Sequence, residues 1–337
     1  MSDALRPDRI IEIGYAFRSS KVLLSAVELG VFSALAGSSL DAIQLSERVG
    51  IDNRCACDFF DALVALGLLA RSVDGHYANT PATAKFLDRR EPSYIGDEFD
   101  HLNRRGYPLW TGLTAALRRA SGSTDDHGAS LYDELYSDAR ERDTFIKGMT
   151  ASSRLAAEAI AVKFDWGRFR TVVDVGCAEG GLLAEIARRH PHIAGTGFDL
   201  PLLRRPFEDF VGKHGLQSRL TFKPGDFRAD PLPTADVVIL GRILHNWDLA
   251  TKQMLLRKAR DALVAHGQIV VYERFIDDER RTSAAGLLAS LNMLVVSPRG
   301  YDFTVTDCIA WMSEVGFCDM HLEPLGTHLS MIVATRP

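Results

Sequence analysis

The chain has 337 residues, of which 46% are hydrophobic and 25% charged, and its formal net charge is −5. These proportions are typical of a soluble globular protein, and the length allows two domains or one large α/β domain with an appendage. A negative net charge without a dense run of lysine or arginine argues against a nucleic-acid partner, because phosphate binding usually needs a basic surface.

Membrane insertion and a disulfide framework are also disfavoured. No apolar run approaches the roughly 20 residues that span a bilayer, and the first ten residues, MSDALRPDRI, lack the apolar core of a signal peptide. We therefore expect a cytoplasmic protein with no membrane partner. The five cysteines lack paired spacings. Cys55 and Cys57 flank one alanine in a helical pattern with no further ligand nearby, so we expect buried helix thiols and predict no metal site.

The N-terminal part is predicted to be helical. Residues 7–35 carry apolar positions at helical intervals, and a polar break between IIEIGYAF and VLLSAVELGVFSAL predicts two helices. Residues 40–72 indicate helix, turn, helix, with Gly50 in the turn and Asp52 or Asn53 as the cap of the second helix.

A tight hairpin is predicted next, at the Asp74–Gly75 pair. Helix, turn, helix and hairpin together are typical of a winged helix. Its second helix, in RCACDFFDALVALG, is apolar and acidic rather than basic. An internal or subunit-packing role is therefore favoured over DNA binding.

The helical pattern extends to about residue 164. Residues 120–130, ASGSTDDHGAS, predict a loop within it, and residues 131–164 predict connector helices. The helical period gives way to a strand at residues 164–170. We therefore expect one domain at residues 1–165 and a second at residues 166–337.

The second domain alternates strands and helices from TVVDVGC to GQIVVYERF, which predicts a Rossmann-like, doubly wound parallel sheet covered by helices on both faces. The last segments, CDMHLEPL and HLSMIVATR, predict a hairpin that adds an antiparallel terminal strand.

A glycine-rich turn follows the first of these strands, in residues 170–181, RTVVDVGCAEGG. Small residues at a strand-to-helix turn let a nucleotide-type ligand lie against backbone amides. One class of protein with such a turn is the nicotinamide dehydrogenases, and Asp199 fits that class because it ends the second strand, where a ribose-binding acid belongs. Against it, Asp174 lies inside the strand end where it could face a cation, and Asp226 closes the third strand where a base edge could be read.

The motifs DVGCAEGG, GFDLP, PGDF, ILHNWD and GQIVVYERF, in this order, resemble the small-molecule O-methyltransferases that use S-adenosylmethionine. This group includes caffeate-type and hydroxyindole methyltransferases and bacterial polyketide-tailoring relatives. The resemblance covers nearly the whole chain, because the family also begins with a helical, winged-helix-like dimerisation domain. It implies a homodimer that binds S-adenosyl-L-methionine through residues at Asp174, Gly176, Asp199, Leu200, Asp226, Phe227, Gly241, Arg242 and Trp247. One departure is the turn, where Cys177 or Ala178 replaces a usual third glycine.

The same resemblance makes His245 the catalytic base and gives Glu273 and Asp302 as the acids that orient it. A phenol with a pKa near 10 is poorly ionised at neutral pH, and a histidine is mostly neutral there and accepts a proton. Two departures are noted: Asp302 stands where the family more often has glutamate, and Asn246 where it commonly has aspartate.

The acceptor is expected to be a small aromatic metabolite. The resemblance places substrate contacts on segments that contain Trp110, Phe145, Met149, Asn292 and Met293, and the segment 286–300 is expected to form a buried helix over the site that ends at Pro298. Two other functions stay open: methylation of carbon or nitrogen by the same fold, and a non-catalytic regulator that senses S-adenosylmethionine.

Overall fold

The computed structural model describes residues 6–119, 136, 138–297, 299–326 and 328–337. The loop expected at residues 120–130 lies outside the described residues. By its internal contacts the chain divides between Pro108 and Leu109, earlier than the boundary expected near residue 165. The reason is that the connector helix α10, Ala139–Lys163, packs on α11, Gly181–Arg189, and β8, Cys318–Gly326, of the second unit.

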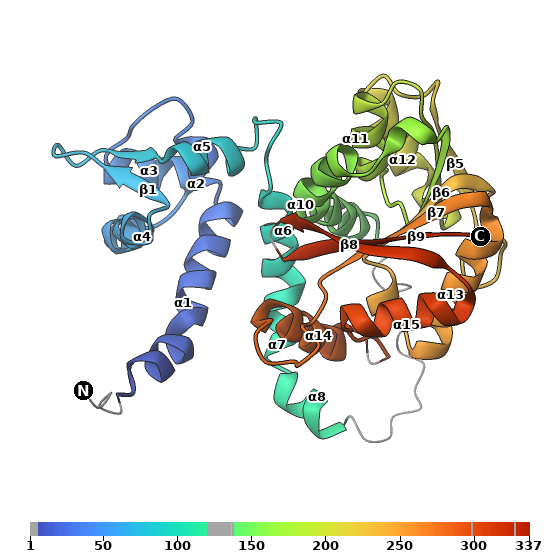
Figure 1. Ribbon diagram of the computed structural model, residues 1–337. Coiled ribbons are helices and arrows are strands. Elements are labelled where there is room, and N and C mark those ends of the chain that lie inside the picture. The colour runs from blue at the N-terminus through green and yellow to red at the C-terminus, as the bar shows by residue number, and fades with distance from the viewer. Residues whose placement is uncertain (1–5, 120–135, 137, 298, 327) are drawn as a thin grey trace. The chain divides into compact units, whose positions relative to one another are not determined.

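The first unit is a small helical domain with one hairpin (Figure 1). Its elements are α1 Asp8–Glu28, α2 Val31–Ala34, α3 Ala42–Val49, α4 Asn53–Ala65, β1 Leu69–Arg71, β2 Tyr77–Asn79, α5 Pro81–Phe86, α6 Gly96–His101, the π-helical turn η1 Leu102–Gly106 and α7 Tyr107–Trp110, which crosses the division.

The first helix is longer than expected. The polar stretch at residues 18–21 does not break α1, which continues to Glu28, so the prediction of a break there is wrong. Polar residues are tolerated because this stretch of the helix is largely exposed. The chain turns instead at Gly30, whose φ of 71° is a left-handed conformation that glycine adopts readily.

The winged-helix pattern is present in the first unit. Gly50 ends α3 with φ 74°, and the Asp52 side chain caps α4 by accepting a hydrogen bond from the Arg54 amide. β1 and β2 pair antiparallel around the Asp74–Gly75 turn. The helices bury one apolar core, which includes Phe32, Leu45, Phe60, Leu63 and Tyr77.

The cysteines of α4 differ from the prediction. Ala56, Phe60 and Leu63 lie on the buried face of this helix, and Cys55 and Cys57 lie on its exposed side. The expectation of buried helix thiols is therefore wrong.

The second unit begins with α8 Leu113–Arg119 and α10 and is built around one sheet (Figure 1). Its remaining elements are η2 Trp166–Arg168, β3 Thr171–Val175, α11 Gly181–Arg189, β4 Ala194–Asp199, η3 Pro201–Leu203, α12 Arg204–Lys213, β5 Leu220–Pro224, β6 Ala235–Gly241, η4 Leu244–Asn246, α13 Leu249–Ala262, β7 Leu263–Glu273, α14 Ala284–Val296, α15 Val305–Val315, β8 Cys318–Gly326 and β9 Leu329–Thr335.

The described residues form a seven-stranded sheet in the order β5-β4-β3-β6-β7-β9-β8. The first five strands of this order are parallel, and β9 is antiparallel to both of its neighbours. The predicted doubly wound sheet with an antiparallel terminal strand is confirmed. β9 does not form the edge, however, because the hairpin places β8 outside it.

Helices cover both faces of this sheet. α10, α11 and α12 bury one apolar cluster against it, and α13 and α15 bury a second cluster against the opposite face. The strand order reverses direction between β3 and β6, so the carboxyl ends of these strands open a crevice where ligands of such sheets bind.

α14 differs in two respects from the helix expected over the site. It ends at Val296, and Pro298 lies outside the described residues. Only Gly286 and Met293 are buried on it, and the Leu288 side chain is 52% exposed. The expectation of a buried helix is wrong, because most residues of α14 are half-buried and Leu288 is exposed.

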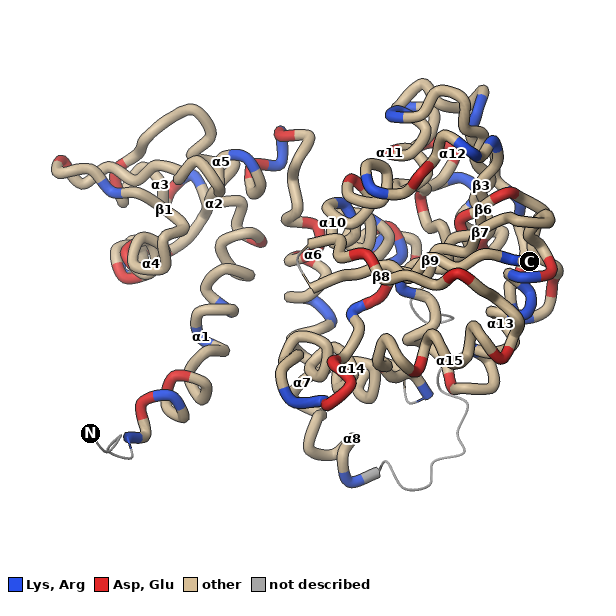
Figure 2. Tube along the Cα trace, in the orientation of Figure 1, with Lys and Arg blue, Asp and Glu red and all other residues tan. Residues whose placement is uncertain are grey.

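None of the helices in the described part of the chain has the length and apolar character that a bilayer crossing requires. Lysine and arginine are interspersed with aspartate and glutamate along both units (Figure 2). The absence of a nucleic-acid partner stays a prediction.

Candidate active site

The expected cofactor residues come from adjacent strands of the sheet. Asp174 lies on β3, Asp199 ends β4, Asp226 follows β5, and Gly241 ends β6. Because these strands are parallel, their carboxyl ends meet at one edge, and the four residues therefore gather there.

The turn after β3 brings its backbone close to other elements. Gly176 has φ 74°, and a side chain at this position would collide with Ile243. Gly180, with φ 86°, precedes the first turn of α11. Ala178 also has a positive φ of 49°, which explains physically why a glycine would suit the position that departs from the family pattern.

Asp199 is held by two backbone amides. Its Oδ2 accepts a hydrogen bond from the Ala178 amide at 2.9 Å, and its Oδ1 accepts one from the Leu200 amide at 2.8 Å. Burial raises the pKa of Asp199 to about 6, and these two hydrogen bonds oppose the rise. A carboxylate has about four acceptor positions, so each oxygen keeps one that can accept a hydrogen bond from a ligand hydroxyl. Leu200 is half-buried beside it.

Asp174 is a buried acid at the floor of this edge. Its side chain takes part in no hydrogen bond among the described residues, and burial, followed by the charge of Asp199, raises its pKa to about 8. A cation next to this carboxyl would favour its charged form. The residues at this edge therefore fit a ligand with vicinal hydroxyls and a positive charge, as S-adenosylmethionine has.

A second acid, Asp226, is already paired. Its Oδ2 lies 2.9 Å from Arg228 Nη2. Burial raises the pKa of Asp226, but hydrogen bonds from Arg228 outweigh it and leave the pKa below its usual value. Phe227 and Trp247 meet edge to face with centroids 5.9 Å apart, and the Arg228 guanidinium lies 5.4 Å from the Trp247 ring. This cluster offers flat faces for a purine.

The end of β6 closes the same edge. A side chain at Gly241 would collide with the Tyr272 ring. Arg242 has a left-handed φ of 54°, donates its amide hydrogen to the Tyr272 carbonyl at 2.9 Å, and reaches α10, where Nη1 lies 2.6 Å from Ser152 Oγ. The left-handed residue turns the chain sharply between β6 and His245.

His245 lies on η4 between two buried acids. Its Nδ1 is 3.3 Å from Glu273 Oε2 and 3.4 Å from Asp302 Oδ1, and its backbone amide donates to Glu273 Oε1 at 3.3 Å. Exposure is 8% for His245, 1% for Glu273 and 2% for Asp302, so water screens these charges little. Burial raises the pKa of Glu273, and the charge of His245 opposes the rise.

This arrangement leaves one ring nitrogen for chemistry. Since Nδ1 faces the acids, Nε2 is the nitrogen that can accept a proton, and among the described residues no hydrogen bond involves it. Asp302, although shorter than a glutamate, still reaches the imidazole. The ligand atoms of His245, Glu273 and Asp302 lie within 4.8 Å of one another, a spacing that would also accommodate a metal ion.

The expected substrate residues are only partly brought together. Trp110 Nε1 donates a hydrogen bond to Asn292 Oδ1 at 2.9 Å. Met293, the next residue on α14, is buried, and α14 packs against η4, which carries His245. Phe145 and Met149 lie one turn apart on α10 and are half-buried.

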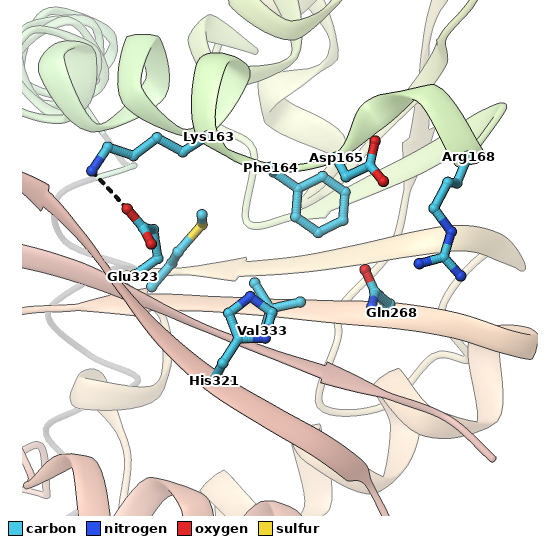
Figure 3. A pocket seen from close by; sticks show the side chains of 9 residues that line it. Lys163, Phe164, Asp165, Arg168, Gln268, His321, Glu323 and Val333 are labelled. Carbon is cyan, nitrogen blue, oxygen red and sulfur yellow. Dashed lines mark hydrogen bonds and ion pairs between the residues drawn. The ribbon is translucent and has the colours of Figure 1, made fainter.

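A separate pocket contains none of the expected site residues (Figure 3). It lies where the end of α10 meets β7, β8 and β9, and it is lined by Lys163, Phe164, Asp165, Arg168, Gln268, His321, Glu323, Met331 and Val333. Lys163 bridges its rim to Glu323 at 2.7 Å. It plays no part in the site at the strand ends.

Sequence reasoning missed Arg228, Tyr272 and Lys252. Arg228 follows Asp226 by two residues, and this spacing alone does not reveal their pairing. Lys252 carried a usable signal, because helical spacing places it with Leu255, Leu256 and Ala259 on the buried face of α13. A lysine at a core position of an amphipathic helix indicates a buried charge that needs a partner.

Three comparisons agree with this geometry. Residues 110–318 match the family model of the O-methyltransferase domain, and residues 11–89 match that of the O-methyltransferase dimerisation domain. Tetracenomycin polyketide synthesis 8-O-methyl transferase TcmO of Streptomyces glaucescens is 38% identical over 98% of this chain and 97% of that protein. N,N-dimethyltransferase OxyT of Streptomyces rimosus is 33% identical over 97% of this chain and 96% of that protein.

A solved structure resembles the whole chain. Human N-acetylserotonin methyltransferase in complex with S-adenosylmethionine has a TM-score of 0.89 at 27% identity, covering 100% of this chain and 99% of that one. The sheet with β9 inserted before its edge, and the acids at its strand ends, define an S-adenosylmethionine-dependent methyltransferase. More narrowly, the chain belongs to the O-methyltransferase family, whose methyltransferase and dimerisation domains it carries.

Proposed function

We propose that this enzyme methylates a hydroxyl group of a small aromatic natural product and that His245 is the general base. The observation that carries the proposal is the position of His245 Nδ1, 3.3 Å from Glu273 and 3.4 Å from Asp302. A base that points one nitrogen at buried acids is fixed in orientation and stabilised when it takes a proton.

When bound, S-adenosylmethionine supplies an activated methyl group on its sulfonium. Asp199 would accept hydrogen bonds from both ribose hydroxyls, and Asp174 would face the cationic methionyl part. Phe227 and Trp247 would enclose the adenine beside Asp226, with Leu200 on the ribose side. Gly176, Gly241 and Arg242 would complete the wall, the two glycines because a side chain at either position would collide with its neighbours.

The protein's part in the reaction is alignment and proton removal. The acceptor hydroxyl would donate a hydrogen bond to His245 Nε2, and its proton would move to that nitrogen as the hydroxyl oxygen becomes the nucleophile. Glu273 and Asp302 would hold the imidazole and balance its charge. The low exposure of all three side chains keeps water away from this step.

The acceptor pocket is proposed to be aromatic in character. Trp110 and Asn292 would provide a flat face and a hydrogen-bonding amide, and Met293 would line the same wall from α14. Phe145 and Met149 would contribute from α10. Two relatives support an aromatic acceptor: the tetracenomycin polyketide 8-O-methyl transferase and a 3-hydroxy-5-methyl-1-naphthoate 3-O-methyltransferase of Streptomyces sahachiroi, 32% identical over 92% of this chain.

We also propose a homodimer in the cytoplasm. The match to a dimerisation domain supports the dimer. So does the first part of α1, where apolar side chains are exposed in the single chain: Ile10, Ile11, Ile13, Tyr15 and Phe17. Such a run is costly on a monomer surface.

Nitrogen methylation is a second candidate, because a relative 33% identical to this chain is named an N,N-dimethyltransferase. An amine acceptor that is neutral at working pH needs no strong base, so the two functions differ in their demand on His245. Screening phenols and aryl amines for release of S-adenosylhomocysteine, with and without a chelator, separates them and also tests the expectation that no metal takes part.

The proposed base is tested with His245→Ala. We expect its kcat toward a phenol to fall by about 10²- to 10⁴-fold, with an unchanged dissociation constant for S-adenosylmethionine measured by calorimetry. The matched control is His321→Ala in the separate pocket, which should keep kcat. A His245→Ala enzyme that turns over a phenol at the wild-type rate would falsify the assignment.

A further inference from the structure

Lys252 is a fully buried lysine that contacts the segment carrying Asp302. Its side chain is 0% exposed and lies on the face of α13 that carries Leu255, Leu256 and Ala259. A buried ammonium is costly unless it is paired or hydrogen-bonded, so its contacts show what retains it.

These contacts lie on the segment that carries Asp302. Lys252 Nζ donates a hydrogen bond to the carbonyl oxygen of Tyr301 at 2.9 Å. It also lies 3.0 Å from the centroid of the Tyr301 ring, 4.9 Å from that of Phe303 and 5.6 Å from that of Trp311. Tyr301 and Phe303 flank Asp302 in sequence, so the ammonium contacts the chain on both sides of this acid.

The charges around Lys252 are those of the proposed proton-transfer site. Burial lowers the pKa of Lys252 to about 7, and the charges of Glu273, Asp302, Asp248 and Cys308, in this order, oppose the decrease. Glu273 Oε2 and Asp302 Oδ2 are buried and accept no hydrogen bond from a described residue. Two acids beside one imidazole leave an excess of negative charge, which Lys252 opposes and which the charge of Arg242 also opposes at Glu273.

We propose that Lys252 is a positioning residue that acts through Asp302: it fixes the segment 301–303 and its positive charge offsets one of the two acids facing His245. This inference rests on the proposed role of His245 and deepens it. With the cation present, the negative charge of the two acids that face the imidazole is largely offset. Without it, the uncompensated acids hold the proton on the cluster more strongly.

A packing role alone makes a different prediction. The aromatic rings of Tyr301, Phe303 and Trp311 would also accept an apolar side chain of similar length. If Lys252 only fills space, a methionine should preserve kcat at every pH, or should lower it by a factor that does not change with pH.

The test is the pH profile of kcat for Lys252→Met. We expect kcat at pH 7 to fall about tenfold, the acidic limb of the profile to move to higher pH, and activity to recover toward pH 9. KM and the affinity for S-adenosylmethionine should change little. Lys163→Met is the matched control, because Lys163 also donates to a backbone carbonyl and pairs with a carboxylate, but at the separate pocket. It should leave the profile unmoved.

Coupling to Asp302 is tested by a double-mutant cycle. In an Asp302→Asn background, Lys252→Met should lower kcat much less than in the wild type, because one of the acids it balances is already neutral. Equal factors in both backgrounds, or a pH profile that stays in place, would overturn the proposal.

A measurement without turnover separates this inference from the proposed function. The side-chain resonance of Lys252, labelled at Cε and assigned with Lys252→Arg, can be titrated by NMR in the wild type and in Asp302→Asn. We expect the midpoint of Lys252 to fall in Asp302→Asn, because an opposing charge is lost. The same midpoint in both proteins would reject the link between Lys252 and Asp302, even if methyl transfer is confirmed. A lower midpoint in Asp302→Asn would support this link, even if His245 proves not to be the base.

Discussion

The indole nitrogen of Trp110 donates a hydrogen bond to the side-chain oxygen of Asn292, 2.9 Å away and 182 residues further along the chain. The bond joins the end of α7 to the middle of α14 and fixes which way the Asn292 amide points. With its oxygen engaged by Trp110, the NH₂ group of Asn292 is the part left to meet a ligand.

Trp110→Phe should therefore weaken substrate binding rather than chemistry. The ring is retained and the hydrogen bond is lost, so KM for the aromatic acceptor should rise about fivefold with kcat nearly unchanged. Trp166→Phe is the control, because Trp166 also donates its indole N–H, to the Ile160 carbonyl at 3.2 Å, but in the core. It should lower the melting temperature and leave KM alone. An unchanged KM in Trp110→Phe would contradict a role in the acceptor pocket.

Asp174→Asn should stabilise the cofactor-free protein at alkaline pH. The pKa of Asp174 is raised to about 8 from 3.8, so the folded state binds its proton more tightly than the unfolded state does. Free energy of unfolding is then lost as pH rises from about 4 to about 8. Asparagine removes this dependence, and the free energy of unfolding of the variant should exceed that of the wild type by several kcal/mol, on the order of 5, at pH 8. The difference should shrink toward pH 4 in urea unfolding experiments.

The control for Asp174 is Asp236, whose pKa is shifted in the opposite direction. At Asp236, burial raises the pKa, but hydrogen bonds from Arg170 and Thr171 outweigh it and leave the pKa lowered. Its stabilising effect is present at neutral pH and lost as pH falls through the lowered pKa, so Asp236→Asn should destabilise the protein at pH 7. In addition, Asp174→Asn should bind S-adenosylmethionine more weakly and Asp236→Asn should not. Equal cofactor affinities for all three proteins would remove Asp174 from the site.

The apolar start of α1 predicts the oligomeric state. Ile13 is 62% exposed and Phe17 53% exposed in the single chain. Aspartate at both positions would put two charges into an apolar interface, which costs several kcal/mol. The double variant Ile13→Asp, Phe17→Asp should elute as a monomer in light scattering at micromolar concentrations at which the wild type is a dimer.

Val73→Asp is the matched control, because Val73 is equally apolar and fully exposed but lies at the hairpin turn. It should remain dimeric. A double variant that keeps the wild-type mass would exclude this part of α1 from the interface.

Several features were predictable because their signals are local. The Asp74–Gly75 hairpin, the Asp52 cap and the strand ends at Asp174 and Asp199 all follow from short patterns whose geometry the backbone imposes. The doubly wound sheet follows from the alternation of strands and helices. The order of β8 and β9 depends on how the last hairpin docks on β7, and no local pattern encodes that docking.

Contacts between side chains that are far apart in the sequence could not be predicted from the sequence. The Trp110–Asn292 bond and the contact of Lys252 with the segment around Asp302 join residues whose separation varies freely with loop length. The helix break at Gly30 was misjudged because the polar residues 18–21 suggested a loop, whereas an exposed helix accepts them at little cost.

The two amides that hold Asp199 have a consequence for turnover. Ala178 and Leu200 fix this carboxylate before any ligand arrives, so little rotational freedom remains to be lost on binding. The product, S-adenosylhomocysteine, carries the same ribose, so the preorganised carboxylate should increase its binding affinity equally. Release of product must then depend on what distinguishes the two molecules, the sulfonium charge, and Asp174 is the proposed site residue placed to sense its loss. We therefore expect a slow step after chemistry and strong inhibition by S-adenosylhomocysteine. In Asp174→Asn, the affinity for S-adenosylhomocysteine should fall less than the affinity for S-adenosylmethionine.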